Sequence, residues 1–248
     1  MVTSLAAGAP LTPVWRNTAG GLTFAFHSPG GRRFLKWAPI DSGLDLAAEE
    51  TRLRWLAGRS PVPRVVSSGT SATGSWLVTE ALPGDNAVSP RWQSDPRPAV
   101  SAIGHGLRAL HDALPVSDCP FSWGVGERVA RAVDQGRHNP AEWHREHRQL
   151  SLVQALARLE APPPIDRLVV CHGDACAPNT LLEESGTWIG HVDLGSLGVA
   201  DRWADLAVAT WSLEWNWGPG WGPTLLDAYG ITDDPLRTAY YRLLWDLG

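Results

Sequence analysis

The most informative part of this chain is the stretch His172-Gly173-Asp174-Ala175-Cys176-Ala177-Pro178-Asn179, followed shortly by His191-Val192-Asp193-Leu194-Gly195. The apolar run 168–171 predicts a strand that delivers Asp174 to a loop, and a second predicted strand, 188–192, delivers Asp193. Phosphoryl transfer from a nucleotide needs a carboxylate to receive the proton of the acceptor hydroxyl, and oxygen ligands to hold magnesium on the phosphates. Asp174, Asn179 and Asp193 supply these groups, so the pattern predicts a phosphoryl-transfer site.

The lysine content points the same way. The chain has 21 basic residues, and only one of them, Lys36, is a lysine. It lies in the alternating stretch 33–37, directly after Pro29-Gly30-Gly31, which predicts a hairpin turn. A compact ammonium reaches phosphate as a point charge, a role that a planar guanidinium does not duplicate. Lys36 could be a leftover surface lysine, but its position on a strand fits the phosphate-binding lysine of kinases.

Bulk composition excludes several classes of function. A chain of 248 residues with a formal charge of −5 and no basic run argues against nucleic acid as the main partner. No apolar run is long enough to span a bilayer, and residues 1–10 lack the charged start of a signal peptide, so we expect no membrane partner. Three cysteines, Cys119, Cys171 and Cys176, form no paired framework and favour a reducing cytoplasm. Cys176 has no evident partner that would activate a thiolate, so it is interpreted as a loop residue and not a nucleophile.

Hydrophobic periodicity divides the chain into a β-rich first part and a helical remainder. The first eighty or so residues predict strands and one helix over 44–58, where Leu46, Leu53 and Leu56 mark an apolar face. Helices are then predicted over 99–114 and over most of 128–159, with a break at 136–140. The chain is again predicted helical from Asp201 onward, with a Gly/Pro-rich interruption at 218–223.

The histidines on these helices favour structural roles. His105 and His111 are interpreted as capping or core residues. His144 and His147 could approach a metal ion across one helical turn, but no third ligand is evident, which argues against a metal site there.

With these residues in view, the chain resembles the aminoglycoside phosphotransferases, most closely the 3′-phosphotransferase type. The resemblance rests on His172-Gly173-Asp174 with Asn179, on the run 192–207 from Val192-Asp193-Leu194-Gly195 to Asp205-Leu206-Ala207, and on Tyr240-Tyr241-Arg242-Leu243-Leu244 near the end. It covers most of the chain and is loosest between residues 87 and 164.

The resemblance implies an α+β, bilobal, protein-kinase-like fold. Residues 1–82 would form an N-lobe with a small antiparallel β-sheet and one helix, which binds the nucleotide. Residues 83–248 would form a mostly α-helical C-lobe with the catalytic loop, the magnesium site and the acceptor pocket. The implied cofactors are Mg²⁺ and either ATP or GTP as phosphoryl donor.

The resemblance also implies roles for individual residues. The catalytic aspartate falls on Asp174 and the magnesium ligands on Asn179 and Asp193. Nucleotide contacts fall on the residues of the N-lobe: Lys36 for the phosphates, Glu49 as the acidic partner of this lysine, Phe34 stacked on adenine, and the backbone of Thr79 and Ala81 at the hinge. Asp205 would tie the catalytic loop in place.

The predicted acceptor pocket departs from the family's pattern. Where the family offers acidic and arginine side chains, this sequence has Ser196, Trp211, Ser212, Trp215 and Trp245, with Glu214, Asp246 and the carboxylate of Gly248 as the nearby anions. The chain has 14 tryptophans, and those spaced one helical turn apart could be either core or a wall for the substrate. An aromatic wall suits a flat or weakly charged ligand by stacking, and it could also hold an amine by cation–π contact.

These observations predict a cytoplasmic, nucleotide- and magnesium-dependent phosphotransferase that acts on a hydroxyl of a small-molecule antibiotic. The resemblance favours an aminoglycoside and a role in resistance or self-resistance. The alternatives are a kinase of a nucleoside or cyclic peptide antibiotic and, more remotely, a nucleotide-binding pseudokinase. Only eleven residues separate Asp193 from Asp205, too few for the activation segment with which protein kinases dock a peptide.

Overall fold

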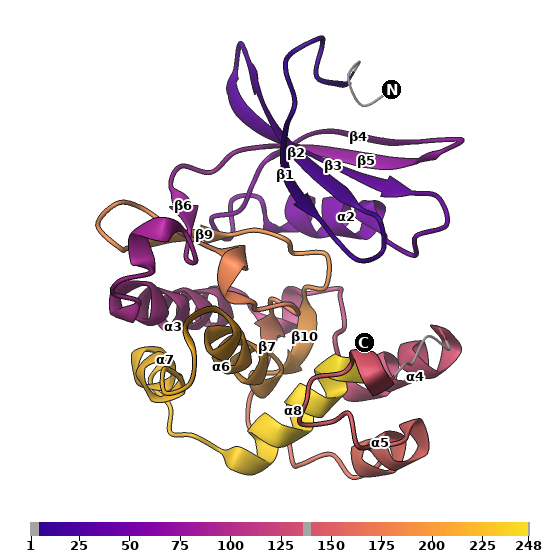
Figure 1. Ribbon diagram of the computed structural model, residues 1–248, viewed down its shortest axis with the longest axis vertical. Helices are drawn as coiled ribbons and strands as arrows, with labels where there is room; N and C mark the ends of the chain where they lie inside the picture. The colour runs from indigo at the N-terminus through magenta and orange to yellow at the C-terminus, as the bar shows by residue number, and fades with distance from the viewer. Residues whose placement is uncertain (1–4, 136–139, 248) are drawn as a thin grey trace. The chain divides into compact units, whose positions relative to one another are not determined.

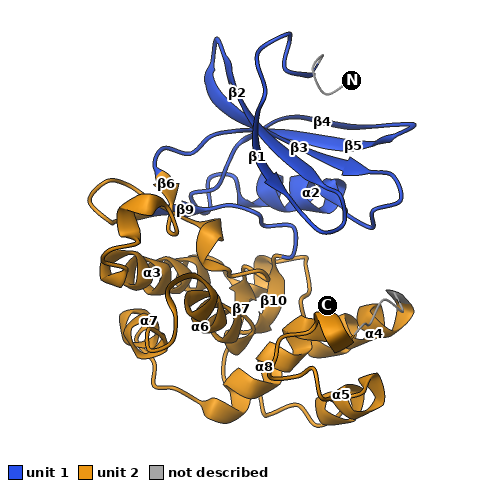
Figure 2. Ribbon diagram, in the orientation of Figure 1, with its two compact units in different colours: residues 1–84, 189–196 blue, residues 85–188, 197–248 orange. Residues whose placement is uncertain are grey.

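The computed structural model describes residues 5–135 and 140–247. Within this part of the chain, the contacts define two compact units (Figure 2). Unit 1 comprises the chain up to Gly84 together with Ile189–Ser196, and unit 2 comprises the rest. The catalytic-loop residues 172–179 therefore belong to unit 2, whereas Asp193 belongs to unit 1.

Unit 1 is built on a five-stranded antiparallel sheet in the order β1-β2-β3-β5-β4 (Figure 1). The strands are β1 (Thr12–Arg16), β2 (Leu22–Ser28), β3 (Gly31–Pro39), β4 (Val65–Ser71) and β5 (Gly74–Glu80). The predicted hairpin at Pro29-Gly30-Gly31 is confirmed, since Ser28 pairs with Gly31. Because successive strand residues alternate between faces, Phe34 and Lys36 share one face of β3 while the buried Leu35 lies on the other.

One helix, α2 (Leu46–Leu56), packs on this sheet against β3, β4 and β5. Its first turn is capped by the side chain of Asp45, which accepts a hydrogen bond from the Ala48 N–H at 2.9 Å. Leu53, Leu56 and the acidic residue Glu49 form its buried face. The helix predicted over 44–58 is thus confirmed with shorter ends.

Unit 2 is mostly helical. Its helices are α3 (Arg97–Ala113), α4 (Val125–Gln135), α5 (Leu152–Leu159), α6 (Trp203–Trp217), α7 (Gly222–Tyr229) and α8 (Pro235–Leu247). Its strands are short: β7 (Leu168–Cys171) pairs antiparallel with β10 (Gly198–Asp201), and β6 (Asp85–Asn86) pairs with β8 (Thr180–Leu182). Strand β9 (Trp188–His191) spans the division between the units.

Helix α6 is the centre of unit 2. It contacts α3, α7 and α8 (Figure 1), and every residue from Trp203 to Leu213 is buried. A helix that is apolar all round belongs in the middle of a core, and the few polar residues of α6 are therefore the ones to examine for function.

The packing of α3 on α7 depends on a glycine. A Cβ atom added at Gly104 would lie 2.5 Å from the carbonyl oxygen of Leu225 and 2.9 Å from the Cβ of Ala228. Real Cβ atoms do not approach backbone oxygens so closely, so only glycine lets the two helices come this near without a shift.

One predicted helical segment is wrong in its extent. Two helices, α4 and α5, replace the predicted 128–159 helix, and from residue 140 to α5 the chain forms turns and a short 3₁₀ segment at Pro140–Glu142. A new helix starts at Ser151 because its hydroxyl and the side chain of Gln154 form a capping box. The predicted break at 136–140 falls largely on residues 136–139, which lie outside the described residues.

No helix in the described ranges is long and apolar enough to cross a membrane.

Candidate active site

The loop that follows β7 is anchored to α6 through one carboxylate. Asp205 accepts hydrogen bonds from the backbone N–H groups of His172 (2.6 Å) and Gly173 (2.9 Å), and its side chain is fully buried. His111 lies 3.0 Å from the same carboxylate through Nε2, and its Nδ1 lies 2.8 Å from the hydroxyl of Tyr229. Gly173 has a φ of +86°, a conformation that glycine adopts without strain. The predicted structural roles of Asp205 and His111 are confirmed.

The environment of Asp205 keeps this anchor ionised. Burial by itself raises the pKa of a carboxyl group. Here the hydrogen bond and charge of His111, the charge of His172 and the backbone N–H of Gly173 outweigh burial, and the pKa of Asp205 is held below its ordinary value.

The loop presents the half-buried carboxylate of Asp174 in a fixed orientation. The Cys176 thiol donates to Oδ1 at 3.1 Å, and the Asn179 amide donates to Oδ2 at 3.2 Å. The same Asn179 nitrogen also donates to the backbone oxygen of Asp174 at 2.9 Å. Both oxygens are thus positioned by neighbours, which suits a residue that aligns a hydroxyl and takes its proton. The sequence analysis missed the contact of the Cys176 thiol with Asp174, although only two positions separate these residues in the chain.

A second anchor joins the loop to α6. The hydroxyl of Ser212 accepts a hydrogen bond from the Ala177 N–H at 2.9 Å, and Ser212 is buried. The sequence placed Ser212 among the acceptor-pocket positions. The structure corrects this, because its hydroxyl supports the catalytic loop.

The residues predicted to hold magnesium have suitable donor atoms. Both hydrogen bonds of Asn179 use the amide nitrogen, so the amide oxygen is the atom that it can offer to a cation. The Asp193 side chain in unit 1 is 53% exposed and carries a carboxylate. Carboxylate and amide oxygens are ligands that Mg²⁺ accepts, so each of these two residues carries an oxygen of the type that the implied ion prefers.

In unit 1, Lys36 forms ion pairs with two acidic residues. Its Nζ lies 2.6 and 2.8 Å from the two oxygens of Glu49 and 2.8 Å from Oδ1 of Asp193. The predicted pairing of Lys36 with Glu49 is confirmed. Burial lowers the pKa of this lysine, but the charges and hydrogen bonds of Glu49 and Asp193 outweigh it and the net shift is upward. Lys36 is therefore a permanent cation at neutral pH.

Asp193 has an unusual backbone. Its φ is +63°, one of the few positive values at a non-glycine residue in the described chain. Aspartate adopts this left-handed region more readily than most residues, and such conformations concentrate at functional sites.

The predicted adenine contacts lie where the first half of β3 pairs with the last residues of β5, and directly after β5. Phe34 pairs with Thr79 across the two strands, and the guanidinium of Arg32 lies 5.0 Å from the Phe34 ring. The Ala81 N–H donates to the Arg32 carbonyl at 3.0 Å. The Ala81 N–H is thus already engaged. An adenine at this position would have to replace that hydrogen bond or bind the carbonyl oxygen of Ala81.

The predicted acceptor residues differ in how accessible they are. Trp211 is fully buried and therefore belongs to the core, so the structure corrects its predicted contact with substrate. Trp215 is 42% exposed. Ser196 belongs to unit 1, whereas Trp211 and Trp215 belong to unit 2, and Gly248 lies outside the described residues.

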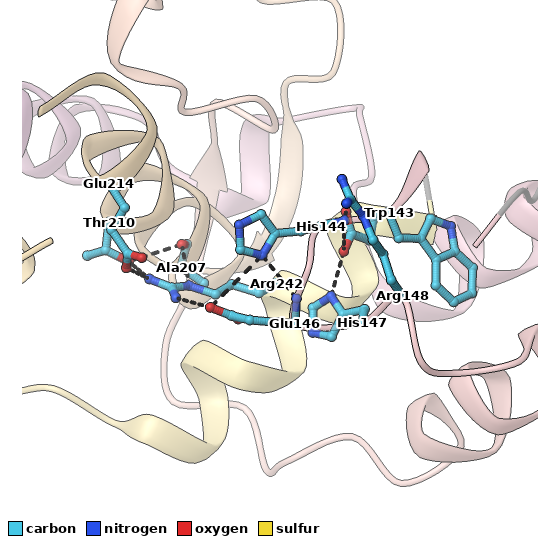
Figure 3. Close-up of polar contacts among 10 residues, drawn as sticks. Trp143, His144, Glu146, His147, Arg148, Ala207, Thr210, Glu214 and Arg242 are labelled. Atoms are coloured by element: carbon cyan, nitrogen blue, oxygen red, sulfur yellow. Dashed lines mark hydrogen bonds and ion pairs between the residues drawn. The ribbon is translucent and has the colours of Figure 1, made fainter. Parts of the chain in front are cut away.

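The two remaining acids of the predicted acceptor pocket, Glu214 and Asp246, contact basic or polar neighbours, and Figure 3 shows Glu214 beside Arg242. Glu214 pairs with Arg242 at 2.9 Å. Asp246 lies 2.5 Å from Nδ1 of His147 and accepts from the His144 N–H at 3.2 Å, and its side chain is only 6% exposed. These partners lie between 28 and 102 residues away along the chain, so no local pattern could identify them.

Among the described residues, one group of three side chains has spacing that a metal ion would accept: His111, Cys171 and Asp205. Burial raises the pKa of the Cys171 thiol well above its ordinary value, and the thiol donates to the Asp201 carbonyl at 3.4 Å. Asp205 is engaged by backbone N–H groups. Asp205 and His111 thus belong to the structural anchor of the loop described above, and Cys171 is a buried thiol beside it.

Comparison with known proteins places this geometry in context. The model of the phosphotransferase enzyme family matches residues 15–241. An aminoglycoside 3′-phosphotransferase of Streptomyces fradiae is 42% identical over 224 residues, which cover 84% of this chain and 81% of the relative.

Two solved structures are also similar. The crystal structure of an aminoglycoside-3′-phosphotransferase of type VIII matches with a TM-score of 0.84 and 35% identity, covering 97% of this chain and 94% of the other. An aminoglycoside phosphotransferase of Streptomyces rimosus, solved with ADP and streptomycin, matches with a TM-score of 0.78 and 32% identity, covering 99% and 96% of the two chains. The predicted resemblance and the α+β, kinase-like fold are confirmed.

Proposed function

The chain belongs to the phosphotransferase enzyme family, and on this basis we propose that it transfers a phosphoryl group from a nucleoside triphosphate to a hydroxyl of a small-molecule antibiotic. Aminoglycosides are the acceptors named for its relatives and the first class to test. Such a modification would give the host resistance or self-resistance.

The observation that carries this proposal is the built catalytic loop. Asp174 is fixed on both carboxylate oxygens by Cys176 and Asn179, and the loop itself is tied to α6 through Asp205. A loop that is held so closely around one carboxylate suits a reaction whose barrier is lowered mainly by positioning.

In the proposed reaction, an O–P bond forms between the acceptor oxygen and the γ-phosphorus, and the bond from this phosphorus to the bridging β–γ oxygen breaks. Asp174 receives the proton of the acceptor hydroxyl, and a nucleoside diphosphate leaves. Lys36, oriented by Glu49, attracts the phosphates of the donor. Asn179 and Asp193 are the residues that would hold Mg²⁺, which when bound neutralises charge on the phosphates.

Phe34 and the backbone of Thr79 and Ala81 are the proposed adenine contacts. Either ATP or GTP could serve as donor, and we propose the cytoplasm, where these nucleotides are abundant, as the place of action. The three free cysteines are compatible with a reducing compartment.

The test is mass spectrometry of antibiotics after incubation with the protein, Mg²⁺ and ATP or GTP, with Asp174→Asn as the matched variant. We expect one added phosphoryl group with wild type. Loss of a general base costs about 10²- to 10⁴-fold in rate, so Asp174→Asn should lose turnover while it still binds nucleotide. Equal nucleotide binding by both proteins with no product from either would instead support the pseudokinase.

A further inference from the structure

One exposed tryptophan lies on the same side of α6 as the catalytic loop. Ser212 marks this side, because its hydroxyl holds the Ala177 N–H of the loop at 2.9 Å. Trp215 is three residues further on, and residues three apart are neighbours on a helix surface. Trp215 is also 42% exposed, so part of its ring is open to a ligand.

The ring of Trp215 has a rigid backing. Its centroid lies 5.3 Å from that of the buried Trp211 and 5.4 Å from that of Trp245 on α8. Trp211 is in turn covered by His144, whose ring centroid is 4.3 Å away. Burial lowers the pKa of His144 below its ordinary value, so this imidazole adds no charge at neutral pH.

Two acids, Glu214 and Glu146, lie close to the guanidinium of Arg242 (Figure 3). Arg242 binds Glu214 at 2.9 Å, approaches Glu146 at 3.8 Å and lies 5.3 Å from the Trp211 ring centroid. Its side chain is only 12% exposed. A ligand ammonium that used Glu214 would therefore have to displace a guanidinium with several contacts.

Asp246 is also poorly accessible to ligands. His147 and the His144 N–H occupy its carboxylate, and little of it reaches solvent. The cavity beside Trp215, of about 340 Å³, is lined by His144, Arg145, Arg148, Glu214 and Trp215. Two arginines against one paired glutamate disfavour a multiply charged cation in this cavity.

We propose that Trp215 determines acceptor specificity by stacking, and that the acceptor is a hydroxyl-bearing antibiotic with a flat unsaturated ring and at most one positive charge. This inference rests on the proposed function and narrows its substrate class. Arg242 contributes by pairing with Glu214, and the burial of Asp246 keeps that acid away from a polycation.

The test compares two acceptors, a nucleoside antibiotic and a neomycin-type aminoglycoside, by kcat/KM from phosphorylated product. Wild type should prefer the nucleoside by at least tenfold. Trp215→Leu should lower kcat/KM for the nucleoside by about ten- to a hundredfold, the range that base–aromatic stacking provides, mainly through KM. The KM of the nucleotide donor should stay unchanged. Trp15→Leu, at a tryptophan that is 69% exposed in unit 1, is the matched control and should behave as wild type.

A second variant tests the charge argument. Arg242→Gln should leave Glu214 unpaired and so raise kcat/KM for the neomycin-type acceptor relative to the nucleoside by about fivefold or more. If Arg242→Gln does not fold, as judged by its thermal midpoint, the Trp215→Leu comparison decides alone, because an exposed ring can be replaced without loss of the core.

The two proposals fail in different ways. Preference of wild type for the neomycin-type acceptor, with Trp215→Leu unchanged, would overturn this inference and leave the proposed function standing. Absence of product with every acceptor, with Asp174→Asn indistinguishable from wild type, would overturn the proposed function and this inference together.

Discussion

The hydrogen bonds of Asp205 predict a large effect of a small substitution, Asp205→Asn. The buried carboxylate accepts two backbone N–H groups and lies 3.0 Å from His111. An asparagine keeps one oxygen, but its NH₂ group would face a donor, which leaves a buried N–H unsatisfied and removes a charge-assisted bond.

Two losses contribute to the effect, and they are not independent. A hydrogen bond to a charged group contributes about 1.5–3 kcal/mol, and an unsatisfied buried donor costs about 1–3 kcal/mol. Since the losses overlap, we expect Asp205→Asn to lower the free energy of unfolding by about 3–5 kcal/mol, the range for a broken buried ionic contact. Because the same bonds hold the catalytic loop, turnover should fall as well.

The prediction has a definite pH dependence. The pKa of Asp205 is depressed in the folded protein, so its stabilising effect is fully present above the pKa of an unfolded aspartate, about 3.9. It is lost as the pH falls through the lower, folded-state pKa. The difference in the free energy of unfolding between wild type and Asp205→Asn should therefore be constant from pH 5 to 8 and shrink below about pH 4.

Urea unfolding followed by tryptophan fluorescence, with amide hydrogen exchange at His172 and Gly173, provides the assay. Asp112→Asn is the control, because Asp112 forms its ion pairs at the surface with a side chain that is 41% exposed and should cost no more than about 1 kcal/mol. If Asp205→Asn costs no more than this control, and the amides of His172 and Gly173 keep their protection, the anchoring argument is wrong.

Three further predictions follow from single contacts. Lys36→Met removes an ion-pair partner of the buried Glu49 and should lower kcat/KM for the nucleotide about a hundredfold, and Lys36→Arg should not restore it; steady-state kinetics with varied ATP would refute this by showing a near-normal kcat/KM. Cys176→Ala removes one of the two donors to Asp174 and should lower kcat by much less than Asp174→Asn does, with no change in nucleotide binding; a kcat equal to wild type would show that the thiol positions nothing. Gly104→Ala places a Cβ 2.5 Å from a backbone oxygen of α7 and should destabilise the protein by about 1–3 kcal/mol through overpacking, which a raised thermal midpoint would contradict.

The local sequence was sufficient for several of the elements, although not for the extent of the helix predicted over 128–159, and for the roles that depend on short separations. The hairpin before Lys36, the helix around Leu53 and the strand before the catalytic loop follow from periodicity and turn residues, because these features depend on neighbours in the chain. The pairing of Lys36 with Glu49 was predictable because the family resemblance supplied it, and the structure shows the two in contact.

The sequence could not decide which side chains are already engaged in contacts within the protein. Ser212 was assigned to the acceptor pocket, but it supports the catalytic loop; Trp211 was left between core and wall, and it is core. Residues one or two positions apart on α6 differ in role because each faces a different neighbour, and only packing sets those neighbours.

The same distinction separates the chemistry from its specificity. The sequence alone predicted the reaction class, because the types and spacing of Asp174, Asn179 and Asp193 follow a motif of phosphotransferases, and the family comparison confirms this class. The tertiary structure alone decided that Glu214 pairs with Arg242 and that Asp246 contacts His147, since both partners come from distant parts of the chain. A charge acts through space and not along the sequence, so whether an acid attracts a ligand or an internal cation is settled only by the fold.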